Sequence, residues 1–138
     1  MLAAVSVLSA AVRAQSCSRD EFETVVGEAA TALRDLNLKN KPAYQGKLRQ
    51  LKEKRGWSQE TFLAEAAPLV QDEKIAAFDQ RSSELLTRIN TMGQEGTATA
   101  QPNCALLGEL RRHMADLVTA QQEKWAYMFG RIDGELAK

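Results

Sequence analysis

The chain contains a single histidine, His113, with carboxylates near it at helical spacing. Glu109, His113 and Asp116 stand at i, i+4 and i+7, so on a helix they share one side and could ligate a metal ion. The alternative is a polar patch in which Arg112 pairs with Glu109 or Asp116. Nucleophilic catalysis would need a nucleophile beside a base, and only one histidine is present. We predict no catalytic and no metal site, and a metal-binding bundle remains a minor alternative.

Haem is the next chemistry to consider. The sequence has no Cys-x-x-Cys-His motif for covalent attachment. Non-covalent ligation could use His113 with Met92. If a helical hairpin pairs Met92 with Asn103, His113 lies about ten residues further along, roughly 15 Å away at 1.5 Å per residue. These two side chains would not reach one iron, so we predict no cofactor.

The two cysteines, Cys17 and Cys104, form no Cys-x-x-Cys pair. In an exported chain an even number of cysteines favours a disulfide, whereas in a cytosolic protein they would be unrelated thiols. A disulfide needs the two Cα atoms within about 7 Å. The helices that begin after Cys17 and at Cys104 would then start at the same end and run roughly parallel. Lipidation of Cys17 remains an alternative to the disulfide.

Residues 48–67, LRQLKEKRGWSQETFLAEAA, combine a basic helix that ends at Gly56 with a second helix that starts at Ser58. Leu48 and Leu51 supply the apolar face before the glycine, and Leu63 with Ala66 supplies it afterwards. This stretch resembles the first two helices of phage-repressor-type helix-turn-helix domains. The resemblance implies DNA binding by a further helix after a short turn.

The segment that would supply the recognition helix begins with Pro68 and is acidic. Residues 56–95 hold seven acidic and three basic residues, a net charge of −4, and the whole chain has a net charge of zero. Phosphate contacts dominate DNA affinity. We therefore interpret the pattern as ordinary signals for the end of one helix and the start of the next, and we predict no nucleic-acid partner. A cytosolic DNA-binding regulator is the alternative function.

Two features could form a surface for a partner. Residues 39–55 hold seven basic residues and one acidic residue, and could meet an acidic surface such as lipid headgroups, or an envelope protein. Aromatic side chains near the end of the chain could anchor a partner. The alternatives are that the cations face acidic helices of their own bundle or solvent, and that the aromatics pack on the second helix. The candidate partner-binding residues are Lys47, Arg49, Lys52, Lys54, Arg55, Trp125, Tyr127 and Phe129.

Good helix formers dominate the chain, and no alternating run is long enough for a strand. The sequence predicts an all-α fold, a helical bundle of four to five helices built on a long antiparallel helical hairpin. Residues 15–138 would form one domain. The first expected elements are a helix at 18–36 capped by Ser18, a turn at 37–40 and a helix from Pro42 to Gly56. A third helix is capped by Ser58, is interrupted around Pro68 and 71–73, and resumes to Met92. A loop at 93–102 and a last helix from Asn103 to about Leu136 follow.

The amino terminus carries an apolar run at residues 2–12, about eleven residues long, which is too short to span a bilayer as a helix. Small residues follow it, and Ala14 offers a cleavage site. We predict a signal peptide at residues 1–14, a periplasmic or secreted location and no transmembrane helix in the mature chain. An apolar first helix is the alternative. Together these features favour a non-enzymatic structural or protein-interaction module of the bacterial envelope.

Overall fold

The computed structural model describes residues 17–98 and 103–138. Within these residues the chain forms four α-helices and no strand, which confirms the all-α prediction. The predicted signal peptide lies outside the described residues. The helices are α1 (Arg19–Arg55), α2 (Gln59–Val70), α3 (Glu73–Ala98) and α4 (Cys104–Ala137).

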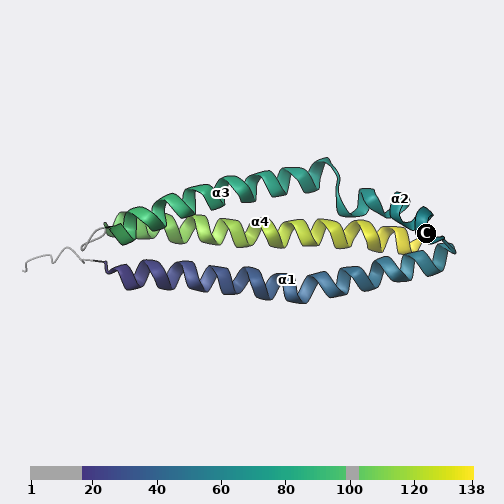
Figure 1. Ribbon diagram of the computed structural model, residues 1–138, viewed down its shortest axis with the longest axis horizontal. Helices are drawn as coiled ribbons and strands as arrows, with labels where there is room; N and C mark the ends of the chain where they lie inside the picture. The colour runs from purple at the N-terminus through teal and green to yellow at the C-terminus, as the bar shows by residue number, and fades with distance from the viewer. Residues whose placement is uncertain (1–16, 99–102) are drawn as a thin grey trace, which may run out of the picture.

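The helices form an elongated bundle in which α4 lies between α1 and α3 (Figure 1). The helices α1 and α4 start at the same end and run in the same direction, while α2 and α3 return antiparallel to both. Cys17 and Cys104 lie at that shared starting end at disulfide distance, with Cα atoms 5.2 Å apart. This is the arrangement that the two cysteines predict.

Side chains at the helix ends accept the backbone hydrogen bonds that the helices cannot make internally. Ser18 accepts from the Glu21 amide at 3.3 Å, and Ser58 accepts from the Thr61 amide at 3.2 Å. Asn103 accepts from the Ala105 amide at 2.8 Å. The helix α1 ends at Gly56 in the left-handed region, with φ 65°, where glycine is favoured. The structure thus confirms the helix starts and the helix end that the sequence predicts at these four residues.

The predicted turn at 37–40 is wrong, because α1 continues through it and through Pro42 as one helix of 37 residues. Pro42 is exposed, so its ring and its missing amide hydrogen affect the solvent side of the helix, where a bend is tolerated. Tyr44 and Leu51 are buried in the same helical register as Phe22, and this packing holds the helix together. Figure 1 shows α1 bending gently along its length.

The predicted loop at 93–102 is also wrong in its first part, because α3 continues past Met92 to Ala98. Gly96 is buried directly against the ring of Phe22, so the helix end has a tertiary contact that a loop would lack. The Thr97 hydroxyl donates to the Gly93 carbonyl at 2.9 Å, which supports the last turn. Residues 99–102 lie outside the described residues.

The core consists of two apolar clusters along the length of the bundle. One lies toward the disulfide and the other toward the opposite end. Between them Gln121 donates to Ser82 at 2.7 Å, and Ser82 is the one buried polar residue among those described. The helices α1, α3 and α4 contribute to both clusters, and α2 contributes Leu69 to the second. The buried members are Phe22, Val25, Ala29, Leu85, Ile89, Leu107, Leu110, Met114 and Leu117 in the first cluster, and Tyr44, Leu51, Leu69, Ile75, Met128 and Ile132 in the second.

Candidate binding surfaces

The predicted basic surface on α1 is largely engaged within the molecule. Lys47 donates to the Asp133 carboxylate, and Lys54 donates to the Leu136 carbonyl. Arg55 contacts the Glu135 carboxylate at 3.2 Å. The expected internal partners were the acidic first and third helices, whereas these contacts join the end of α1 to the last turns of α4. Cations are favourable there because a helix carboxyl end carries partial negative charge.

Two of the predicted basic residues, Arg49 and Lys52, make no hydrogen bond or ion pair to α4 in the described part of the chain. Lys52 reaches the neutral amide of Gln59 at 2.6 Å, and its ammonium group lies over the ring of Phe62. Arg49 is exposed and makes no hydrogen bond or ion pair within the described part of the chain. Binding of a partner by the predicted basic residues therefore remains a prediction, with Arg49 and Lys52 the members best placed for it.

The predicted aromatic residues are half-buried and pack against other helices of the molecule. Tyr44 on α1 meets the ring of Trp125 edge-on at 6.0 Å and that of Phe129 at 5.4 Å. Tyr127 lies on another side of α4, with its ring 6.3 Å from that of Phe78 on α3. Such edge contacts add to the apolar area that the rings bury. The aromatic residues thus hold α1 and α3 onto α4, and any role in partner binding would be additional.

The junction between α2 and α3 is fixed by Asp72. Its carboxylate accepts from the Ile75 amide at 2.7 Å, in the manner of a helix cap, and from Arg131 at 2.6 Å. The Tyr127 hydroxyl also donates to it. The hydrogen bond from the Ile75 amide, followed by that from Tyr127, lowers the pKa of Asp72, and the latter bond raises the pKa of Tyr127. The predicted interruption is therefore present at residues 71–72, while Pro68 lies inside α2.

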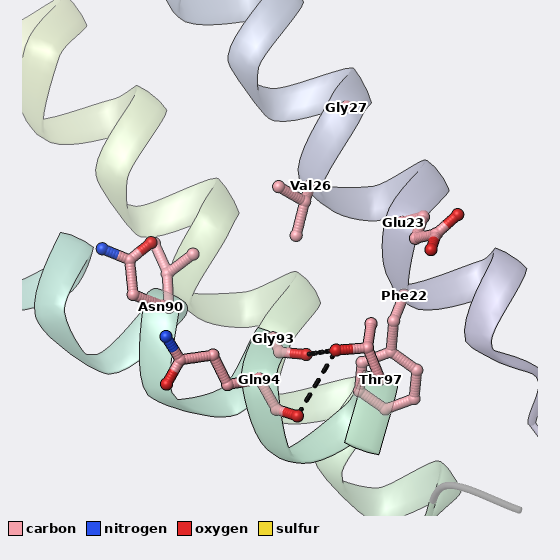
Figure 2. A pocket seen from close by; sticks show the side chains of 9 residues that line it. Phe22, Glu23, Val26, Gly27, Asn90, Gly93, Gln94 and Thr97 are labelled. Carbon is pink, nitrogen blue, oxygen red and sulfur yellow. Dashed lines mark hydrogen bonds between the residues drawn. The ribbon is translucent and has the colours of Figure 1, made fainter. Parts of the chain in front are cut away.

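A groove lies between α1 and α3 near the disulfide end of the bundle. Its volume is about 420 Å³. Figure 2 shows Val26 directed into the space between the two helices, with the Phe22 ring beside Thr97 at the end of α3. Phe22 and Ile89 are buried beneath it, and Val26 remains 36% exposed. The lining residues are Phe22, Glu23, Val26, Gly27, Ile89, Asn90, Gly93, Gln94 and Thr97.

The groove exists because α1 and α3 both pack mainly on α4 and contact each other less. The two walls each carry a glycine, Gly27 on α1 and Gly93 on α3, and neither adds a side chain to the space. Glu23 is the one charged residue in the lining. Sequence reasoning missed this site because it assigned the α3 wall beyond Met92 to a loop.

His113 lies on α4 and is half-buried, and its buried Nδ1 atom has no hydrogen-bond partner in the described part of the chain. Among residues 17–98 and 103–138, no group of three or more His, Cys, Asp or Glu side chains is arranged to hold a metal ion.

Residues 48–67 form the end of α1, a turn and most of α2, so the two-helix pattern is present locally. The following helix, α3, begins at Glu73 and packs along α4. None of the described helices contains a stretch that is both long enough and apolar enough to cross a bilayer. No family model matches this chain, and neither the curated proteins nor the solved structures include a significant match to it.

Proposed function

We propose that this protein is an exported interaction module of the bacterial envelope that acts by binding and not by catalysis. The groove between α1 and α3 is its binding surface. The occupant is the apolar face of an amphipathic helix from a partner protein. The observation that carries the proposal is the groove itself, an open apolar space with helical walls on both sides.

The composition of the walls supports this occupant. Partner helices commonly bind by laying an apolar face into a groove. The cores of protein interfaces are depleted in charged residues, and every groove residue on α3 is uncharged. Leu86 stands two helical turns before Gly93 on the same side of α3 and is 44% exposed, so it extends the apolar wall beyond the groove.

Export is the second part of the proposal. The apolar run and Ala14 support it from the sequence. The disulfide distance between Cys17 and Cys104 supports it as well, because disulfides persist mainly in oxidising compartments. Retention of Met1 in protein recovered from the cytosol would favour the alternative DNA-binding regulator.

Site-specific photo-crosslinking in cells tests the groove. A crosslinking residue at Val26 or Asn90 is expected to capture the same segment of one partner. The matched position is Leu63, which is 62% exposed on α2 and does not line the groove. Capture from Leu63 should be absent, and Val26→Glu should abolish capture from Asn90.

The proposal fails if the groove positions and Leu63 capture the same proteins equally. It also fails if Val26→Glu leaves capture unchanged while the circular dichroism of the variant matches that of the parent. Because Val26 is partly exposed, the added carboxylate can reach water, and the variant is expected to fold.

A further inference from the structure

A row of six residues follows the outward side of α1 beyond the groove. Their spacing of i, i+4, i+7, i+11, i+15 and i+18 returns to one side of an α-helix. The row is about 27 Å long at 1.5 Å per residue. Five of its members are exposed, and the last is half-buried. This cationic row consists of Arg34, Leu38, Lys41, Gln45, Arg49 and Lys52.

The row carries positive charge that the molecule does not neutralise. It contains four cations and no carboxylate. In the described part of the chain Lys41 and Arg49 make no hydrogen bond or ion pair. Arg34 makes only an exposed contact of 3.8 Å with Asp35, which is a weak interaction in water. The cations Lys47 and Arg55 of the same helix, by contrast, are paired with carboxylates of α4.

Leu38 gives the row an apolar centre. It is 67% exposed, the largest exposed fraction among the large apolar residues described. It lies one turn from Arg34 and about one turn from Lys41. An apolar side chain between cations matches the interface of an anionic bilayer, where apolar groups enter the acyl boundary and cations stay at the headgroups.

We propose that the cationic row binds the surface of a bilayer that contains anionic lipid. The helix α1 lies along the surface, the cations contact lipid phosphates, and Leu38 enters the interface. The exposed leucine and the length of the row favour a flat lipid surface over an acidic protein. This proposal does not depend on the groove, whose α1 residues end at Gly27.

Vesicle flotation of the oxidised mature chain, residues 15–138, tests the proposal without the apolar run at residues 2–12. The vesicles are phosphatidylcholine alone or phosphatidylcholine with phosphatidylglycerol. Only the second kind is expected to bind through the row, and binding should weaken as salt is raised. Replacing Lys41→Gln and Arg49→Gln together should reduce binding about 25-fold, since each cation near an anionic surface contributes about fivefold.

A matched double variant removes the same charge elsewhere. Lys39→Gln with Arg88→Gln changes two exposed cations off the row and should retain most of the binding. Leu38→Ser should reduce binding about tenfold, and this loss should persist at high salt because it is apolar in origin. Circular dichroism of each variant should match that of the parent, because all these positions are exposed.

Three results would overturn the proposal. Equal binding to both kinds of vesicle would show that charge on the lipid is not recognised. An equal loss in the two double variants would show that net charge, and not the row, determines binding. Binding to immobilised polyglutamate without binding to anionic vesicles would assign the row to an acidic protein instead.

Discussion

Gly96 shows how one residue without a side chain brings two helices together. A Cβ atom built there would lie 2.2 Å from the Phe22 ring, which is far closer than real contacts allow. Three atoms of this fully buried ring, Cδ1, Cε1 and Cγ, would lie within 2.8 Å of the added carbon, so the ring or the helix would have to shift. The end of α3 therefore packs on α1 only because residue 96 is glycine.

Gly96→Ala is expected to lower the free energy of unfolding by about 1–2 kcal/mol, since overpacking outweighs the better helix propensity of alanine. The measurement is urea unfolding followed by circular dichroism. Gly108→Ala is the matched control, because nothing lies within 4 Å of its Cβ position. The control should be as stable as the parent or up to about 1 kcal/mol more stable. Equal stability of the Gly96 and Gly108 variants would contradict this packing.

The carboxyl group of Asp72 links stability to pH. Its pKa is lowered in the folded chain, chiefly by the hydrogen bond from the Ile75 amide and then by that from Tyr127. A lowered folded pKa means that the charged carboxylate stabilises the fold above the unfolded pKa of about 3.9. This stabilisation is lost as the pH falls through the folded pKa.

Asp72→Asn keeps an acceptor for the Ile75 amide but removes the charge that faces Arg131. The variant should be less stable than the parent at neutral pH, and its stability should fall less on acidification below about pH 4. Urea midpoints at several pH values measure this difference. Glu123→Gln, at an exposed position of α4, should leave the slope unchanged. Parallel curves for the parent and Asp72→Asn would contradict the assignment.

At the scale of the element, the cysteine pair ties the start of α1 to the start of α4 across a sequence separation of 87 residues. Closing a loop of that size restricts the unfolded chain by about 4–5 kcal/mol on the entropy model. The oxidised protein should therefore be more stable than Cys17→Ser with Cys104→Ser by an amount of this order. Urea unfolding of the two forms measures the difference.

Intact mass of the native protein before and after reduction and alkylation shows whether the bond is present. Two free thiols, or a stability that does not change on reduction, would count against the disulfide. A diacylglycerol mass on Cys17 would instead assign that residue to a lipid anchor.

Helix ends were predictable from the sequence where local chemistry determines them. Ser18, Ser58 and Gly56 act within a few residues of their own position, and the structure places them as the sequence predicts. Pro42 and residues 93–98 were assigned wrongly because distant contacts decide them. The burial of Tyr44 and Leu51 sustains α1 beyond the proline, and the contact of Gly96 with Phe22 sustains α3.

For the whole molecule, the parallel course of α1 and α4 was predictable because two cysteines specify one distance. The groove was not predictable from the sequence, because it needs a helix on both sides and the sequence pattern predicts a loop for the part of α3 beyond Met92. The aromatic residues and four of the five basic candidates were recognisable as a group, but their partners on all four helices lie up to 86 residues away in sequence. The residue types were enough to select these side chains, but only the tertiary structure shows which residues they contact.

The central position of α4 has a consequence for synthesis of the chain. The helices α1 and α3 each pack mainly on α4, and both apolar clusters draw several of their buried side chains from it. Residues 104–137 leave the ribosome after α1, α2 and α3. A nascent chain that has made only those three helices lacks the helix on which they pack. We therefore expect it to stay loosely structured until α4 has been made. A translocation channel that accepts only unfolded polypeptide could therefore transport this chain until α4 has emerged and the bundle can fold.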